Sequence, residues 1–74
     1  MLREYIYDDK FQIWIVDDSI NVLNYLDIIS FSEDRVVLRC PNNTLDIRGK
    51  DLIISKLLKD ELLIRGQVLN IEFR

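Results

Sequence analysis

The tripeptide Ile-Arg-Gly occurs twice in this chain, at 47–49 and at 64–66, and the two copies lie seventeen residues apart. The same spacing aligns three further sets: Ile20, Val37, Ile54 and Ile71, then Ile28, Leu45 and Leu62, and then Asp17, Asp34 and Asp51. A fixed period with aligned apolar positions is typical of successive two-strand units, because each unit offers its apolar side chains to its neighbours at the same place. The spacing therefore indicates a β protein built from short strand pairs.

Turn-forming residues divide the rest of the chain into runs of strand length. Residues 2–7 and 11–16 are rich in β-branched and aromatic side chains, and the Asp-Asp-Lys sequence between them predicts a hairpin turn. Further turns are expected at 17–19, 24–25, 33–34, 40–43 and 58–60, a tight turn at Gly49 and a kink at Gly66. Residues 56–63 also allow a short helix capped by Ser55, although so short a helix is marginal on its own. The pattern predicts about eight short strands.

The predicted fold is all-β, a small antiparallel meander arranged as an immunoglobulin-like sandwich or as a barrel. A β-solenoid whose rung is the seventeen-residue unit is the alternative. In a solenoid, Asp17, Asp34 and Asp51 would stack as a ladder of like charges, which is destabilising without a cation. The sandwich is therefore preferred.

Length and composition favour one small domain over residues 1–74, with a core that leaves room for stabilisation by oligomerisation. The single cysteine excludes an intramolecular disulfide, and the absence of histidine excludes a Cys/His zinc site. No apolar run has the length of a signal sequence or of a membrane span, so we expect a cytoplasmic protein. A net charge of −3 with interspersed signs argues against nucleic acid as a partner.

The chain offers little chemistry for catalysis or for cofactors. Histidine is absent, Cys40 has no imidazole partner, and there is no glycine-rich phosphate loop, so we expect no enzyme, no cofactor and no metal. Two alternatives involve charged side chains, and the first is a calcium site formed by Asp8, Asp9, Asp17 and Asp18. The second is a basic stripe formed by Arg39, Arg48 and Arg65, which Asp46 and Glu61 would neutralise.

Apolar residues outnumber the positions that one inner layer can hold. The inner layer is expected to contain Val37, Leu45, Ile47, Ile54, Leu62, Ile64, Leu69, Ile71 and Phe73. Val36, Leu38, Ile53 and Leu63 would then point to the opposite side. Soluble monomers rarely expose a contiguous apolar patch, so these four residues are predicted to form a protein interface unless bends in the strands bury them.

Three segments carry a resemblance to a known family. They are I-S-F-S-E-D-R-V-V-L at 29–38, L-D-I-R-G-K-D-L-I-I at 45–54 and E-L-L-I-R-G-Q-V-L-N-I-E-F at 61–73. Their spaced apolar framework resembles the YabP/YqfC family of small endospore-formation proteins, from about Ile20 onward. The Cys-Pro-Asn-Asn turn at 40–43 departs from the glycine-containing turn that is more usual there.

The resemblance implies a non-catalytic, sandwich-like β protein of the mother cell, paired with a polytopic membrane protein near the outer forespore membrane. It implies no catalytic or ligand-binding residue. We therefore expect a protein-interaction module of endospore formation that forms a homo-oligomer, binds such a membrane protein, or does both. A self-assembling β scaffold and a small β domain that binds anions or nucleic acid remain the alternatives.

Overall fold

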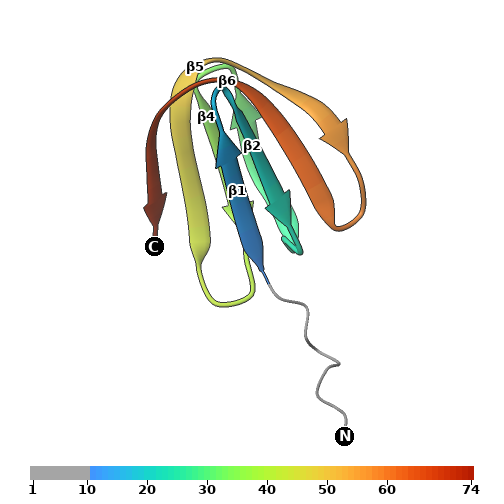
Figure 1. The fold of residues 1–74 in the computed structure, drawn as a ribbon. Helices are drawn as coiled ribbons and strands as arrows, with labels where there is room; N and C mark the ends of the chain where they lie inside the picture. Colours follow the sequence, from blue (N-terminus) through green and yellow to red (C-terminus); the bar gives the residue numbers. More distant parts are fainter. Residues whose placement is uncertain (1–10) are drawn as a thin grey trace, which may run out of the picture.

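Six β-strands make up the part of the chain that the computed structural model describes, residues 11–74 (Figure 1). They are β1 (Gln12–Val16), β2 (Ser19–Leu23), β3 (Asp27–Ser32), β4 (Arg35–Arg39), β5 (Thr44–Leu57) and β6 (Glu61–Phe73). All neighbouring strands pair antiparallel in a single sheet with the order β1-β2-β6-β5-β4-β3. The described residues form no helix.

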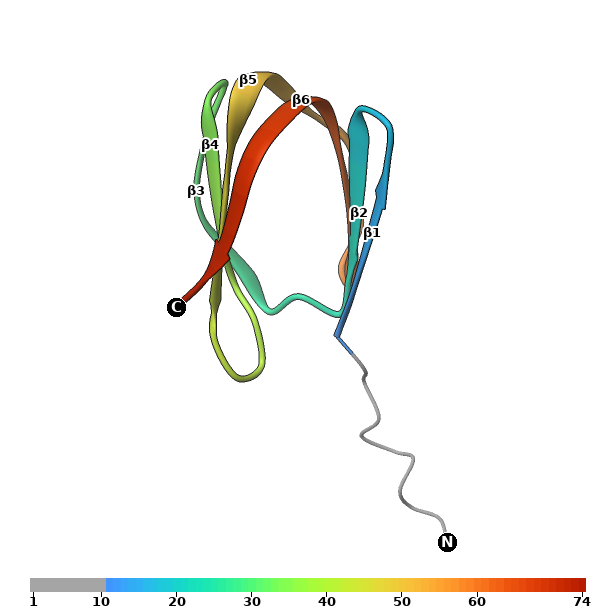
Figure 2. The same cartoon turned by 60° about the vertical axis from the view of Figure 1, so that its left-hand side comes forward.

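Two of the strands are long enough to belong to both halves of the molecule. β5 has 14 residues and β6 has 13, and the two pair along most of their lengths. Both strands bend near their middle, so the sheet folds over and its two halves face each other (Figure 2). One half contains β1, β2 and the hairpin end of β5 and β6, and the other contains β3, β4 and the remaining parts of β5 and β6.

Glycine permits the bend because the two long strands approach each other closely there. Gly66 has φ +137°, and a Cβ at this position would lie 2.6 Å from the carbonyl oxygen of Asp51. A Cβ at Gly49 would collide with the carbonyl oxygen of Gln67. The β5–β6 register shifts between Arg48 and Gly49, as expected where a bulge bends a strand.

Two hairpin turns hold the bend in place. The amides of Gly49 and Leu52 donate hydrogen bonds of 3.1 and 2.7 Å to the carbonyl oxygens of Asp34 and Glu33, in the β3–β4 turn. The amide of Gly66 donates to the carbonyl oxygen of Asp18, in the β1–β2 turn, at 2.9 Å. The chain thus returns to this end of the molecule at 17–18, 33–34, 49–51 and 66, which accounts for the seventeen-residue spacing.

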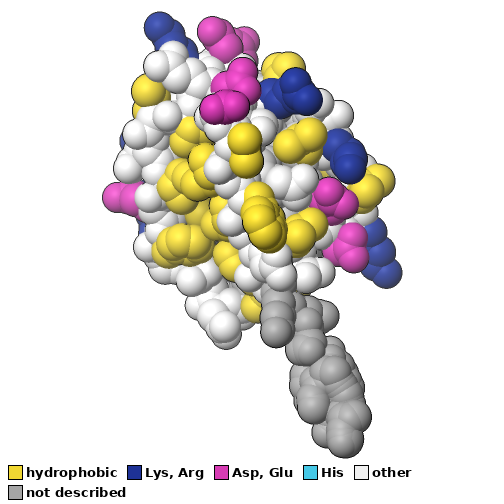
Figure 3. Space-filling model, in the orientation of Figure 1, with side chains coloured by type: hydrophobic (Ala, Val, Ile, Leu, Met, Phe, Trp, Pro, Cys, Tyr) yellow, Lys and Arg dark blue, Asp and Glu magenta, His cyan; other side chains and the backbone are white. Residues whose placement is uncertain are grey.

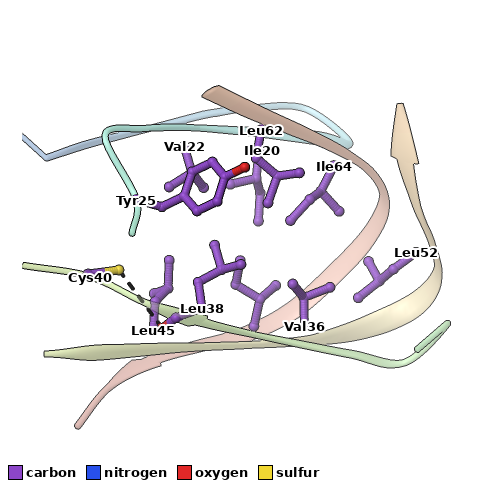
Figure 4. Packing of buried hydrophobic residues seen from close by; sticks show 11 residues of the cluster. Ile20, Val22, Tyr25, Val36, Leu38, Cys40, Leu45, Leu52, Leu62 and Ile64 are labelled. Atoms are coloured by element: carbon purple, nitrogen blue, oxygen red, sulfur yellow. Dashed lines mark hydrogen bonds between the residues drawn. The ribbon is translucent and has the colours of Figure 1, made fainter. Parts of the chain in front are cut away.

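The core fills the space between the two halves of the sheet. Ile20, Val22, Leu62 and Ile64 from one half face Val36, Leu38 and Leu45 from the other (Figure 4). All of these residues are fully buried, and so is Ile47. Leu52 extends the core toward the bend, while Tyr25 and Cys40 lie toward the opposite end (Figure 4). Each of the large aliphatic side chains stabilises the fold by about 1.5–3 kcal/mol through burial.

The predicted all-β class is confirmed, whereas several predicted details of the fold are wrong. The described residues form one folded sheet, not a barrel or two separate sheets, and antiparallel pairing excludes the solenoid. Residues 11–74 contain six strands, fewer than were expected there, because Gly49 and Gly66 bend continuous strands where a turn and a strand break were expected. The strands do not follow the predicted meander order, because β2 pairs with β6 instead of with β3.

The predicted turns at 33–34, 40–43 and 58–60 are confirmed, and the turn predicted at 17–19 is found at 17–18, because Ser19 already belongs to β2. The helical alternative for 56–63 is wrong because β5 and β6 contain most of that segment. The predicted strand at 2–7 and the turn after it lie outside the described residues.

Candidate interaction surface

Two of the four predicted interface residues lie in the core. Val36 and Leu38 are both 0% exposed. Val36 is paired with Ile47 and Leu38 with Leu45, so these side chains share the inner face of the sheet. The prediction reversed the two faces of β4, since Val37, which was assigned to the inner layer, is the residue paired with the outward Asp46. Leu69 and Phe73, also assigned to the inner layer, are exposed.

The other two, Ile53 and Leu63, do lie on the outside of the sheet. Strand pairing places Ile53 in a cross-strand row with Arg65, Ser19 and Val16. Leu63 lies in the next row, between Asn21 and Lys56, and this row ends at Trp14. We call Trp14, Val16, Ile53 and Leu63 the outer apolar face.

The outer apolar face is strongly exposed at both of its ends. Trp14 is 59% exposed, Val16 60% and Ile53 58%, while Leu63 in the middle is half-buried. Figure 3, in the orientation of Figure 1, shows apolar side chains in the middle of the view and toward the C-terminal end of β6, with charged side chains among them on the side of β2 and the β5–β6 hairpin. Within residues 11–74, no element covers the outer apolar face. Trp14 and Val16 were not among the predicted interface residues. Their alternation with Ile13 and Ile15 in the sequence does place them on the opposite face of the strand from those two residues.

Polar side chains beside the residues of the outer apolar face contact one another. The Asn21 side chain donates from Nδ2 to Oε2 of Glu61 at 3.2 Å, and Lys56 Nζ lies 3.5 Å from the same oxygen. The Asn21 hydrogen bond and the Lys56 charge lower the pKa of Glu61. Trp14 donates from Nε1 to Oε1 of Gln12 at 3.0 Å. These contacts orient Asn21, Glu61 and Lys56, and the Lys56 side chain remains 48% exposed beside the apolar residues.

The outside of the other half of the sheet is organised around a buried carboxylate. Arg35 donates to Asp46 through both Nε, at 3.1 Å to Oδ1, and Nη2, at 2.8 Å to Oδ2. Arg74 Nη2 donates to Oδ2 at 2.8 Å, and Arg48 Nε lies 3.9 Å from Oδ1. The hydrogen bond from Arg35, followed by the charges of the surrounding arginines, lowers the pKa of Asp46 although burial alone would raise it. Asp46 is thus a structural anion covered by arginine side chains.

The three arginines of the predicted basic stripe are not brought together as a separate group. Arg48 turns toward Asp46, and Arg39 is paired with Asp27 and Thr44. Arg65 lies on the other half of the sheet, paired with Ser19 and Ile53. Sequence reasoning missed Arg35 and Arg74 as the main partners of Asp46, because neither is near Asp46 in the sequence.

The remaining candidates for chemistry are dispersed. Asp17 and Asp18 lie in the β1–β2 turn, while Asp8 and Asp9 lie outside the described residues. In residues 11–74 no group of three or more acidic, cysteine or histidine side chains has an arrangement that holds a metal ion. Cys40 is a buried free thiol, and burial raises its pKa. A shallow depression beside the bend is lined by Ser32, Glu33, Asp34, Lys50 and Asp51.

The chain was compared with curated proteins, with solved structures and with protein families. No curated protein and no solved structure matches the chain. In the described part of the chain, no helix has the length and apolar character needed to cross a membrane. Residues 11–74, which include all six strands, match the YabP family. The chain therefore belongs to the YabP family.

Proposed function

We propose that this chain is a non-catalytic protein-interaction module that works in endospore formation. Membership of the YabP family implies a sporulation protein. The observation that carries the interaction role is the outer apolar face, where Trp14, Val16 and Ile53 are each more than half exposed. Large apolar side chains exposed on one face of a protein are typical of binding sites.

The composition of the outer apolar face suits a protein partner. Trp14 is an aromatic side chain of the type that dominates binding energy at interfaces, where one tryptophan buries about 150–250 Å². Glu61, Lys56 and Arg65 lie among the apolar residues, and charged groups at such positions select the partner and its orientation. The face therefore combines an anchor with groups that confer specificity.

A polytopic membrane protein of the sporulation machinery is the partner we favour. The family resemblance supports this choice, and the chain would then act in the mother-cell cytoplasm, held near the outer forespore membrane by its partner. The outer apolar face would bind a segment of that protein exposed to the cytoplasm.

The test uses Ile53→Lys at the native locus of the endospore-forming organism that encodes the chain. Leu69→Lys is the matched control, because Leu69 is also exposed and lies on the far half of β6. We expect Ile53→Lys to lower the yield of heat-resistant spores while the control leaves it unchanged, with equal protein levels in both strains. Equal spore yields in the two strains would overturn the proposed role of this face.

The anion-binding alternative has weaker support. Arg35, Arg74 and Arg48 turn toward Asp46, which neutralises part of their charge, and Arg65 lies elsewhere. No described feature favours it over the apolar face.

A further inference from the structure

Within residues 11–74, β1 lies at an edge of the sheet, and some of its backbone groups point away from the sheet. In the β2–β6 pair, the amides of Gly66 and Asn24 donate to the carbonyl oxygens of Asp18 and Asp60. Because antiparallel partners alternate, the even-numbered residues of β2 bond to β6 and its odd-numbered residues bond to β1. Gln12, Trp14 and Val16 face those odd-numbered residues and use their backbone groups there. The amides and carbonyls of Ile13 and Ile15 therefore point outward.

The side chains at this edge are apolar on both faces of the sheet. Ile15 continues an inner row formed by Ile20, Ile64 and Ile54, but it is 55% exposed because the described sheet ends there. Trp14 and Val16 are exposed on the outer face. A strand added beside β1 would extend the inner row over Ile15 and the outer row over Trp14.

Only β1 among the edge segments of the described sheet lacks the usual protection against pairing. Natural edge strands carry charges, prolines or bulges that prevent it. β3 contains Asp27 and a register shift, the edge half of β5 contains Lys56 and a register shift, and the edge half of β6 contains Glu72. β1, with the sequence Gln-Ile-Trp-Ile-Val, has no charge, no proline and no register shift.

We propose that β1 pairs antiparallel with β1 of a second copy of this chain, about a two-fold axis at Trp14. Ile13 of one copy then bonds with Ile15 of the other through the outward backbone groups, and the reverse pair forms on the other side of the axis. The two Trp14 residues form the pair without backbone hydrogen bonds, in which the side chains are closest. An uncharged strand favours a second copy, since self-pairing places no like charges opposite each other.

The register makes the proposal testable with opposite charges. Trp14→Lys places two lysines directly opposite each other in the homodimer, and Trp14→Glu places two glutamates there. We expect each variant alone to weaken dimerisation at least about tenfold, and an equimolar mixture to form heterodimers more tightly than either variant alone. Light scattering from about 1 to about 100 µM measures the mass, and mixed samples with one tagged partner identify the heterodimer.

Ile53→Lys is the control that separates this inference from the proposed function. Ile53 lies across the outer face on β5, remote from β1 in the strand order, so this variant should dimerise like the wild-type chain. Unchanged circular dichroism of the Trp14 variants, and thermal unfolding like that of the wild-type chain at concentrations where both are monomeric, establish that their folds are intact.

Two results would overturn the proposal. A wild-type full-length chain that stays monomeric over the whole range would show that β1 has no second copy beside it, as would happen if residues 1–10 occupied the edge. A wild-type dimer for which the mixture gives no gain over the single variants would place the contact elsewhere.

Discussion

The amide of Gly66 donates a hydrogen bond to the carbonyl oxygen of Asp18 at 2.9 Å, so the β1–β2 turn is fastened to the bend of β6. Gly66 can bend there because it has φ +137°, a backbone conformation that residues with side chains rarely adopt. The β3–β4 turn is fastened to the bend of β5 in the same way, through Gly49 and Leu52. These contacts keep the folded sheet closed over its core.

Gly66→Ala should destabilise the fold by about 1–3 kcal/mol, the cost of forcing a side chain into a strained backbone conformation. The added methyl group would also press against the carbonyl oxygen of Asp51. Urea unfolding followed by circular dichroism measures the change. Gln67→Ala, at the next and exposed position, is the control and should change the free energy of unfolding by less than about 0.5 kcal/mol. Equal effects of the two substitutions would contradict the role of the bend.

Leu38→Ala and Ile53→Ala should differ sharply, although the sequence pattern had placed both residues on one face. Leu38 is fully buried, so its truncation should cost about 2–5 kcal/mol of folding free energy. Ile53 is exposed, and its truncation should cost less than about 0.5 kcal/mol. The comparison by urea unfolding checks that Leu38 of β4 points into the core and that Ile53 of β5 points away from it, and similar losses at both sites would refute this assignment.

Acid should weaken the fold through Asp46. Its pKa is lowered in the folded protein, so its contribution to stability is present above the pKa of the unfolded chain, about 3.9, and is lost as the pH falls through the folded value. Thermal unfolding between about pH 2 and about pH 6 should show this loss in the wild-type chain. Glu61, whose pKa is also lowered, contributes in the same direction.

The Asp46→Asn variant distinguishes the contribution of Asp46 to the acid sensitivity from that of Glu61. The variant should unfold at a lower temperature near neutral pH, because Arg35 and Arg74 lose their anionic partner. It should also lose less stability on acidification than the wild-type chain, and an identical pH profile would show that Asp46 carries none of the effect.

Cys40 should react slowly with a thiol reagent in the native protein. The side chain is buried and burial raises the pKa of the thiol, so both access and the thiolate fraction are reduced. The rate with a chromogenic disulfide such as Ellman's reagent should rise at least about tenfold in denaturant. A native rate equal to the denatured rate would mean that the end of the core near Tyr25 is open.

The sequence predicted the class of fold and most of its turns because those features depend on local chemistry. Pro41 with Asn42 and Asn43 ends β4, and paired acidic residues turn the chain at 17–18 and 33–34. Gly49 and Gly66 were recognised as special positions. Whether a glycine turns a chain or bends a continuous strand depends on the strand beside it, and that information is not local.

The inward face of β4 and the partners of Asp46 could not be predicted from the sequence for the same reason. Val36, Val37 and Leu38 are consecutive apolar residues, so an alternating pattern cannot show which of them point into the core. Their direction is set by the pairing of β4 with Leu45 and Ile47. Asp46 is covered by Arg35, from β4, and by Arg74, which follows β6. Ile53 and Leu63 were placed outside correctly because they alternate with the buried Leu52, Leu62 and Ile64.

Site-specific photocrosslinking in sporulating cells tests most directly whether the outer apolar face binds a protein. A photoreactive amino acid at position 53 reports on that face, and the same group at position 69 reports on an equally exposed apolar site elsewhere. We predict a sporulation-dependent crosslinked species from position 53 that includes a protein other than a second copy of the chain, and none from position 69. No crosslink at position 53, or the same products from both positions, would contradict the account.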